Sequence, residues 1–275
     1  MFKIFIALIF FVMPLTAWAQ SQNISIDGDH GKLAAVLQTP DNQKNYPLVI
    51  LCHGFTGNKE NFLLTKLADD LEARGIASIR FDFNGHGKSD GDFQDMTVLN
   101  EIEDAKKIYD FASRLPNVKS ISIAGHSQGG VVASMVAGEL GSKKIKAVVL
   151  MAPAAVLRDD SLRGNLFGVT YDALNPPEYV EIFGGHKIGR NYILTAQTLP
   201  IYETAEKFTG NVLMIHGTGD VVVPYTYSLS YKKIYRHGEI KLLDKADHSF
   251  TGEESLVAKI AADFLAEKII GSRHG

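Results

Sequence analysis

The sequence predicts an α/β protein in which helices flank a mostly parallel sheet, with one inserted segment. Short, continuous apolar runs alternate with longer stretches whose apolar residues recur at helical spacing. Continuous apolar runs are typical of strands that are buried on both faces of a parallel sheet. The alternation stops once, at about residues 153–209, and then resumes. Strands that alternate with helices of this length predict a parallel sheet with right-handed crossovers.

The expected elements follow in chain order. A hairpin of residues 23–26 and 33–38 comes first, since turn-forming residues lie between them. The expected strands after it are residues 48–52, 76–83, 121–124, 147–152, 211–215 and 239–243. The expected helices are residues 61–74 and 97–115, a helix of small residues after residue 129, and residues 225–235 and 255–269. In the last helix we expect a buried stripe of Leu256, Ile260, Phe264 and Ile269.

The first nineteen residues have the pattern of a secretory signal. Lys3 supplies a positive charge, residues 4–12 form a continuous apolar run, and residues 17–19 read Ala-Trp-Ala, a small-x-small cleavage site. The apolar run is too short to span a bilayer comfortably. We therefore expect cleavage before Gln20, no stable membrane insertion afterwards, and an exported protein that is periplasmic or secreted.

The rest of the chain, residues 20–275, is predicted to be one domain. No Ser/Pro run, charge block or repeat marks a linker in it. Residues 153–209 lack strand periodicity but are rich in glycine and aromatic residues, so we interpret them as an inserted cap over a site and call them the cap. A net charge of −3 with scattered Lys and Arg gives no footprint for nucleic acid. Cys52 is the only cysteine, which excludes an intramolecular disulfide.

A serine lies on the turn that follows the strand at residues 121–124. The turn is Gly125-His126-Ser127-Gln128-Gly129, and a helix of small residues comes after it. A strand-to-helix turn of this kind exposes the serine hydroxyl in a strained backbone that needs glycine on both sides. The helix start directs N–H groups and a partial positive charge at the same place. Ser127 is therefore the candidate nucleophile.

A serine nucleophile needs a base, and the base needs an acid that fixes its tautomer. The chain order on such a sheet is serine, acid and then histidine, each after a strand. His237 precedes the last expected strand and His274 lies in the terminal tail, so His248, which follows that strand, is the candidate base. Asp247 is adjacent to it and points elsewhere. Asp220, after the preceding strand, is the candidate acid.

Two backbone amides are candidates for binding the oxyanion. One is the N–H of Gln128, directly after the nucleophile, and the other is the N–H of Phe55 in the loop after residues 48–52. Four other histidines stand beside glycines at strand ends, and their spacing matches no metal-ligand pattern. We expect neutral hydrogen bonds to nearby backbone from these four, and no metal or cofactor: His53, His86, His126 and His216. Of them, His126 is expected to border the site.

Together these loops resemble the α/β-hydrolases. The resemblance rests on residues 53–55, on D-F-N-G-H-G-K-S at residues 82–89, on the serine turn, and on the H-G-T-G-D and D-H loops. It covers the whole chain after residue 19. More narrowly, the chain is similar to bacterial cinnamoyl (feruloyl) esterases. This similarity is carried by HGFTGNK, RFDFNGHGKSDG, MTVLNEIEDA and GHSQGGVVASM, and by GVTY and LPIYE in the cap.

The resemblance implies an α/β-hydrolase fold and a role for the cap. In that family the cap covers the acyl group, and an Asp and a Tyr hydrogen-bond the phenolic hydroxyls of the hydroxycinnamoyl ring. By position these roles fall on Asp160 and Tyr192. Two other interpretations stay open: Asp160 as a solvated charge and Tyr192 as a packing aromatic. Phe167 either lines the slot for the ring or holds the cap down.

The expected function is that of a serine ester hydrolase acting on hydroxycinnamate esters through an acyl-enzyme. Its substrate would be a small aromatic ester or a feruloylated saccharide. One alternative is a short-acyl esterase of broad specificity or a peptidase on the same fold. Another is a glycan-binding protein that keeps the fold without catalysis. An oligomeric state does not follow from the sequence.

Overall fold

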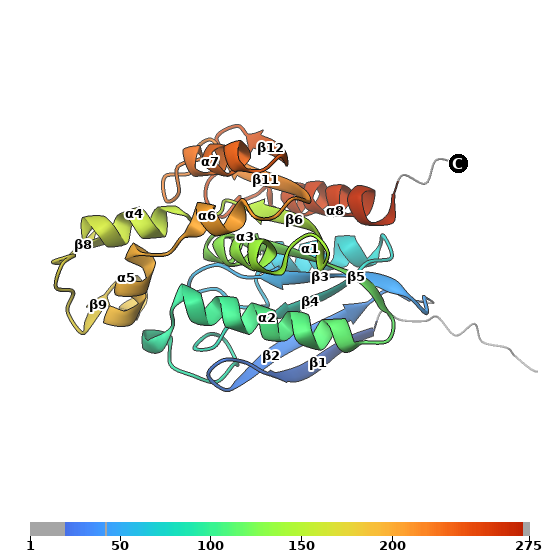
Figure 1. Ribbon diagram of the computed structural model, residues 1–275, viewed down its shortest axis with the longest axis horizontal. Helices are drawn as coiled ribbons and strands as arrows, with labels where there is room; N and C mark the ends of the chain where they lie inside the picture. The colour runs from blue at the N-terminus through green and yellow to red at the C-terminus, as the bar shows by residue number, and fades with distance from the viewer. Residues whose placement is uncertain (1–19, 42, 272–275) are drawn as a thin grey trace, which may run out of the picture.

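The computed structural model describes residues 20–41 and 43–271, and within these ranges an eight-stranded sheet lies between two layers of helices (Figure 1). The strand order is β1-β2-β4-β3-β5-β6-β11-β12. The hairpin β1–β2 is antiparallel and joins β4 in antiparallel fashion, while the pairs from β4 to β12 are parallel. The predicted fold class, a mostly parallel sheet flanked by helices, is confirmed. The expected signal at residues 1–19 lies outside the described residues.

The elements occupy the expected places, with ends that differ by a few residues. The strands of the sheet are β1 (Gln20–Asp27), β2 (Lys32–Thr39), β3 (Tyr46–Cys52), β4 (Ala77–Phe81), β5 (Val118–His126), β6 (Ile145–Met151), β11 (Asn211–Gly217) and β12 (His237–Leu243). The helices outside the cap are α1 (Phe62–Glu72), α2 (Val98–Arg114), α3 (Gln128–Leu140), α7 (Thr226–Ile234) and α8 (Glu254–Ile270), with a short 3₁₀ turn η1 (Phe93–Asp95).

The continuous apolar runs arise because both faces of the sheet are covered. In β3, Leu48 and Ile50 contribute to the core on the side of α2 and α3, whereas Val49 and Leu51 contribute to the core on the side of α1 and α8. Successive side chains of a strand point to opposite faces, so a strand covered on both sides must be apolar at every position. This core holds the carboxyl ends of the parallel strands in fixed places.

The predicted stripe of α8 is wrong at Leu256, which is 48% exposed. Phe264 is buried as predicted, and Ile260 and Ile269 are partly buried against the core. The helix instead buries a stripe of mostly small residues: Val257, Ala258, Ala261, Ala262, Phe264 and Leu265. Helix α8 packs on α1, and small side chains allow the two helix axes to approach. Because the two helices lie close together, alanines are buried in the contact. A prediction based on apolarity alone favours leucine and isoleucine at such positions.

The cap connects β6 to β11 and lies to one side of the sheet (Figure 1). It contains α4 (Val156–Arg163), β7 (Asn165–Leu166), β8 (Val169–Thr170), β9 (Tyr179–Glu181), a 3₁₀ turn η2 (Phe183–Gly185), β10 (Lys187–Gly189), α5 (Arg190–Gln197) and α6 (Ile201–Ala205). Helix α6 packs against α3, which attaches this end of the cap to the nucleophile's helix. The remaining strands form two small antiparallel pairs, β7–β8 and β9–β10.

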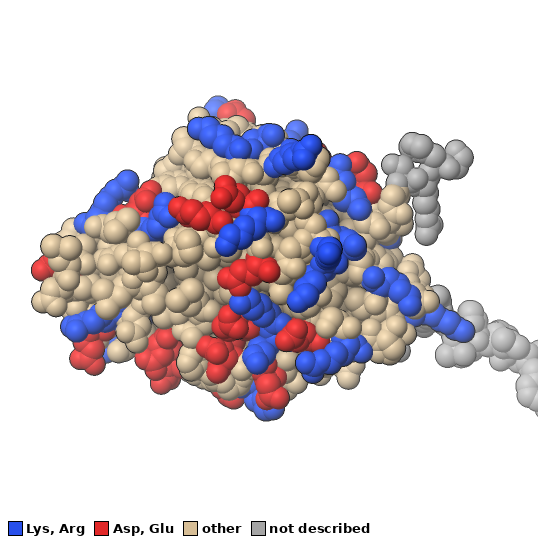
Figure 2. All heavy atoms as spheres, in the orientation of Figure 1, with Lys and Arg blue, Asp and Glu red and all other residues tan. Residues whose placement is uncertain are grey.

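Charged side chains of both signs are interspersed over the main body on the face shown in Figure 2, and the cap at the left of that view is mostly uncharged. In the part of the chain that the structure describes, no helix combines the length and the apolarity required to cross a bilayer.

Candidate active site

Ser127 lies on a strained turn between β5 and α3. Its φ is 56° and its ψ is −123°, a conformation that residues other than glycine rarely adopt. The glycines on both sides are required by space. A Cβ on Gly125 would lie 2.0 Å from the carbonyl oxygen of Gly129, and a Cβ on Gly129 would lie 2.2 Å from that of His53. The turn therefore holds the serine at the carboxyl end of β5.

His248 and Asp220 meet Ser127 at this edge of the sheet. The loop after β12 brings His248 Nε2 to 2.8 Å from Ser127 Oγ, and His248 Nδ1 to 2.7 Å from Asp220 Oδ2. A carboxylate accepts only, so Nδ1 carries the proton and Nε2 is the acceptor for the serine hydroxyl. The structure thus brings the three predicted residues together as a nucleophile, a base and an orienting acid.

Asp220 is fixed by four hydrogen bonds. Its Oδ1 accepts from the backbone N–H groups of Val222 at 2.9 Å and Val223 at 2.8 Å, and its Oδ2 accepts from His248 and His216. Burial favours the protonated acid, but the hydrogen bonds from His216 and His248 outweigh it and hold the pKa of Asp220 well below its usual range. Asp220 is therefore a carboxylate with a fixed direction.

His216 is the residue of this site that sequence reasoning missed. It is completely buried at the end of β11. Its Nε2 donates to Asp220 Oδ2 at 3.0 Å and to the Val223 carbonyl at 2.9 Å, which leaves Nδ1 to accept from Ser228 Oγ at 2.7 Å. The expected backbone contact is present, to the Val223 carbonyl, but the two side-chain partners were not expected. The signal was present: His216 precedes Asp220 by four residues in the loop H-G-T-G-D.

The other three histidines make the neutral backbone contacts that were expected. His53 Nδ1 donates to the Gly54 carbonyl and its Nε2 accepts from the Phe83 N–H, while burial, followed by the nearby His86, lowers the pKa of His53 to about 3. His86 Nδ1 donates to the Asn84 carbonyl.

His126 lies at the edge of the site. Its Nε2 donates to the His248 carbonyl at 2.9 Å, and burial, followed by the neighbouring His248, lowers the pKa of His126 to about 4. It therefore supports the backbone of the base without contacting the serine hydroxyl, and it lines the adjacent cavity.

The two predicted oxyanion donors lie beside the nucleophile. The loop that contains Phe55 is close enough that a Cβ on Gly54 would lie 2.9 Å from Ser127 Cβ. Gln128 is the first residue of α3, where an N–H has no acceptor within the helix. Among the described residues, no hydrogen bond from the Phe55 N–H is present. Both amides are thus available to a negative oxygen on the serine's substrate.

A buried ion pair anchors the Phe55 loop. Lys59 Nζ lies 2.7 Å from Asp82 Oδ2, and the Lys59 N–H donates to Asp82 Oδ1 at 2.6 Å. The side chains are 5% and 0% exposed, so neither charge is solvated by water and each depends on the other. This pair joins the loop that contains Lys59 to the loop that begins at Asp82.

A cavity of about 920 Å³ lies between the serine turn and the cap. Its aromatic wall is formed by Phe55 and Phe167, whose rings stack 5.1 Å apart, and by Phe183, which meets Phe167 edge-on. Asp160 and Tyr192 also line it. The cavity thus combines an apolar slot with a few polar groups, as small-molecule sites do.

Asp160 and Tyr192 differ in exposure and in whether the side chain is already hydrogen-bonded within the protein. The Asp160 side chain is 33% exposed, lies 3.7 Å from Arg163, and burial raises its pKa. Tyr192 is only 3% exposed, and its hydroxyl donates to Gln128 Oε1 at 2.8 Å. The tyrosine proton is therefore committed within the protein, and towards a ligand this hydroxyl is an acceptor.

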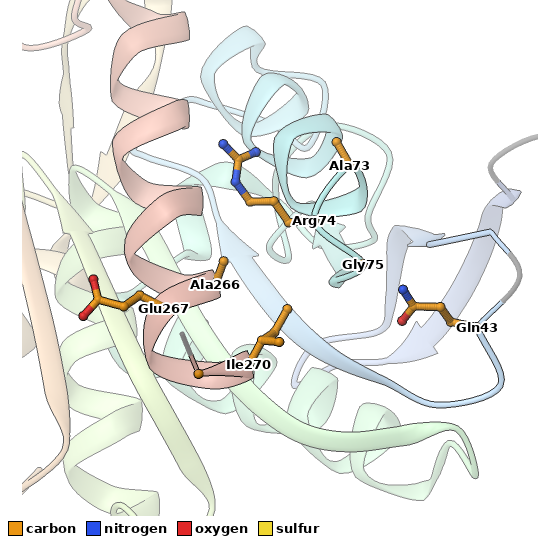
Figure 3. Close-up of a pocket in the computed structure, with 8 residues that line it drawn as sticks. Gln43, Ala73, Arg74, Gly75, Ala266, Glu267 and Ile270 are labelled. Atoms are coloured by element: carbon orange, nitrogen blue, oxygen red, sulfur yellow. The ribbon is translucent and has the colours of Figure 1, made fainter. Parts of the chain in front are cut away.

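A second hollow, of about 430 Å³, lies between the ends of α1 and α8 (Figure 3). Gly75, which lines it, lies two residues before the start of β4, so the hollow lies at the amino end of the strands. Ser127, Asp220 and His248 all follow carboxyl ends. Arg74 at this hollow is paired with Asp263. The hollow is therefore separate from the catalytic edge.

Within residues 20–41 and 43–271, no group of three or more His, Cys, Asp or Glu side chains is placed to hold a metal ion.

Comparisons with known proteins match this architecture. The family model described as serine aminopeptidase, S33 (Hydrolase_4) matches residues 43–172. The structure of Est1E from Butyrivibrio proteoclasticus with bound ferulic acid is similar, with a TM-score of 0.86 and 34% identity, covering 90% of this chain and 99% of that one. A putative hydrolase from Agrobacterium vitis shares the fold, with a TM-score of 0.74 and 21% identity, over 90% of this chain and 99% of that one.

Curated relatives match more distantly. Putative esterase/lipase 2 of Mycoplasma pneumoniae is 26% identical over 247 residues, which is 79% of this chain and 87% of that protein. An uncharacterized 31.7 kDa protein of Escherichia coli is 33% identical over 100 residues, which is 36% of this chain and 35% of that protein. The chain thus spans about a third of the length of the latter relative.

Proposed function

The chain belongs to the α/β-hydrolase superfamily, and we propose that it is an exported serine ester hydrolase that cleaves hydroxycinnamate esters. The observation that carries the proposal is the contact series Ser127–His248–Asp220 at the mouth of an aromatic cavity. Hydrolysis of an ester requires a nucleophile, a proton carrier and donors for an oxyanion, and the carboxyl edge of the sheet provides all three.

The reaction proceeds through an acyl-enzyme. Ser127 Oγ attacks the ester carbonyl while His248 Nε2 takes the hydroxyl proton, and Asp220 stabilises the imidazolium that forms. The N–H groups of Phe55 and Gln128 bind the negative oxygen of the tetrahedral intermediate. His248 returns its proton to the leaving alcohol. Water then attacks the acyl-enzyme by the same steps and releases the acid.

Three observations support a hydroxycinnamoyl acyl group. The cavity has an aromatic wall of Phe55, Phe167 and Phe183, against which a flat ring can stack. Asp160, whose carboxyl group is partly buried, lines the same cavity and can accept a hydrogen bond, as a phenolic hydroxyl requires. The similar structure of Est1E carries bound ferulic acid.

A peptidase is the second candidate, because the matching family model is described as serine aminopeptidase. An aminopeptidase needs an acidic group for the substrate's amino terminus, and Asp160 lines the cavity. The short-acyl esterase alternative corresponds to the esterase/lipase relative. The glycan-binding alternative predicts an unreactive Ser127, and a fluorophosphonate probe that fails to label this residue would favour it.

A substrate panel separates these candidates. We expect kcat/KM for methyl ferulate to exceed that for a butyrate ester and for an amino-acid amide. In the variant Asp160→Asn, turnover of methyl ferulate should fall relative to that of methyl cinnamate, which lacks the phenolic hydroxyl. A preference for butyrate or for the amide, or an equal effect on both aromatic esters, would contradict the proposal.

Export is proposed from residues 1–19 and has its own test. Trp18 is the only tryptophan, so cleavage before Gln20 removes tryptophan fluorescence from the exported protein. An exported product that keeps this emission would overturn the cleavage site.

A further inference from the structure

A buried hydrogen-bond chain links the main body to the cap behind the nucleophile. The Gln128 side chain is at its centre. Its Nε2 donates to Glu101 Oε2 of α2 at 2.9 Å, and its Oε1 accepts from the hydroxyl of Tyr192 of α5 at 2.8 Å. The three residues are 2%, 2% and 3% exposed. Water therefore does not compete for these groups, and each depends on the others for its partner.

Glu101 is the unexpected member of this chain, since a carboxyl group is rarely fully buried. Burial raises the pKa of Glu101 to about 8; the hydrogen bond from Gln128 acts in the opposite direction, and Asp104 adds to the rise. The titratable groups that face it are Asp104 from its own helix, Cys52 from β3 and Tyr192 from α5. At neutral pH the side chain is therefore mostly the uncharged acid.

We propose that Glu101 is a positioning residue for ester hydrolysis: through the Gln128 side chain it holds the oxyanion donor and Tyr192 of the cap in place together. This inference rests on the proposed function. Gln128 supplies the backbone N–H beside Ser127, and the same residue's side chain is held at both ends. An oxyanion donor must lie about 2.7–3.1 Å from the position of the developing negative oxygen, so a small displacement of Gln128 weakens it.

The chain also couples the donor to the cap. If α5 moves away, Gln128 Oε1 loses its buried donor; if Glu101 is lost, Gln128 Nε2 keeps only Met96 Sδ at 3.5 Å. A buried amide without a partner reorients or admits water. The position of Tyr192 and the geometry of the oxyanion hole therefore change together.

The test compares Glu101→Leu with Glu101→Gln. Leucine removes the acceptor, whereas glutamine offers a carbonyl oxygen at the same position. With p-nitrophenyl acetate, whose acyl group is too small to need the cap, we expect kcat to fall about tenfold in Glu101→Leu and to stay within about twofold of the parent in Glu101→Gln. Equal kcat values in the two variants would overturn the proposal.

A matched control separates positioning from loss of stability. Ile108 is buried on the same face of α2, two turns beyond Glu101, and belongs to the apolar core. Ile108→Ala should lower the melting temperature as Glu101→Leu does, but it should leave kcat within about twofold. If Ile108→Ala lowers kcat as much as Glu101→Leu, the role of Glu101 is structural only.

A double-mutant cycle tests the route through Gln128. If Glu101 and Tyr192 act through one side chain, Glu101→Leu combined with Tyr192→Phe should lower kcat by clearly less than the product of the two single effects. Multiplicative effects would overturn the coupling.

The rate at which a fluorophosphonate probe labels Ser127 gives a readout that does not need turnover, since the probe's phosphoryl oxygen occupies the oxyanion hole. If the parent protein is labelled but hydrolyses no ester, the proposed function fails. The labelling rates of the Glu101 variants still decide the positioning role: the role stands if Glu101→Leu is slower than Glu101→Gln, and it fails if the two are equal.

Discussion

The carboxyl edge of the sheet and the cap face each other across one cavity, but different forces place their side chains. At the edge, Ser127, Asp220 and His248 each follow a parallel strand of the sheet, and hydrogen bonds of 2.7–2.8 Å connect them. In the cap, strands β7 and β8 are two residues long, and the aromatic side chains Phe167 and Phe183 are 46% and 54% exposed. Both regions are anchored in the core, which includes Tyr192 and Ile193 of α5, but the aromatic tip of the cap stands in partly exposed loops whereas the triad does not.

Both regions contain a residue other than glycine with a positive φ, but the packing around that residue differs. Ser127 has a positive φ within a turn that is buried between β5 and α3 and opens only to the cavity. Phe167 has a φ of 51° at the tip of the β7–β8 hairpin, where Asn or Gly is usual, and it is followed by Gly168 with a φ of 86°. Strain in a bulky residue is retained where it serves a function. At the tip it directs the ring of Phe167 onto Phe55. We therefore expect separate roles in the proposed function: the edge carries out the reaction and the cap selects the acyl group.

The largest effect is expected at the edge. Ser127→Ala removes the nucleophile and should lower kcat on every ester by roughly a factor of a million, because the reaction then has no covalent route. Steady-state assays with methyl ferulate and p-nitrophenyl acetate measure it, with circular dichroism as the control for folding. Activity close to that of the parent on either ester would contradict the mechanism.

The next largest effect is expected at His216, which donates a hydrogen bond to Asp220 of the triad. His216→Phe keeps the ring volume but removes a hydrogen bond to the Asp220 carboxylate, which should lower kcat about 10- to 100-fold on both esters. Ser228→Ala is the matched control, since it removes only the hydroxyl on the far side of the His216 ring. We expect a smaller loss there. An effect of Ser228→Ala equal to that of His216→Phe would show that the pocket, and not the contact with Asp220, matters.

The sequence alone identifies the residue changed in the first of these predictions, but not the contact tested in the second. Ser127 and His248 are found because a turn and a chain order place them after strands, which is local information. His216 lies in the same kind of loop, but its contact with Asp220 depends on how the residues after β11 fold back. In α8, the close contact with α1 buries Ala258, whereas Leu256 is exposed. For Tyr192 the sequence indicates a place in the cap, while its partner Gln128 depends on how α5 packs on the main body. The local sequence pattern places these residues in their elements, but tertiary packing determines their side-chain partners.

The cap gives the third effect, which should depend on the substrate. Phe167→Ala removes the ring that stacks on Phe55, so kcat/KM for methyl ferulate should fall about tenfold, mainly through KM. For p-nitrophenyl acetate the change should stay within about twofold. Leu174→Ala is the control, since Leu174 is 97% exposed in the cap and does not line the cavity. Equal losses on both esters would show that Phe167 affects the reaction itself and not recognition of the acyl group. The proposed difference in role between the cap and the edge would then be wrong.

The smallest effect concerns stability and lies where the two regions meet. The pKa of Glu101 is about 8 in the folded protein, against an ordinary value of 4.5. The folded state thus keeps a proton that the unfolded chain releases, so the stabilisation is complete below about pH 4.5 and is lost as the pH rises to about 8. Glu101→Gln removes this titration. We expect its melting temperature to exceed that of the parent by a few degrees at pH 8, with a smaller difference at pH 5. Thermal unfolding at the two pH values measures the change. A difference that is larger at pH 5 would mean that Glu101 is ionised in the folded protein, and the chain from α2 to the cap would then be held by a buried charge.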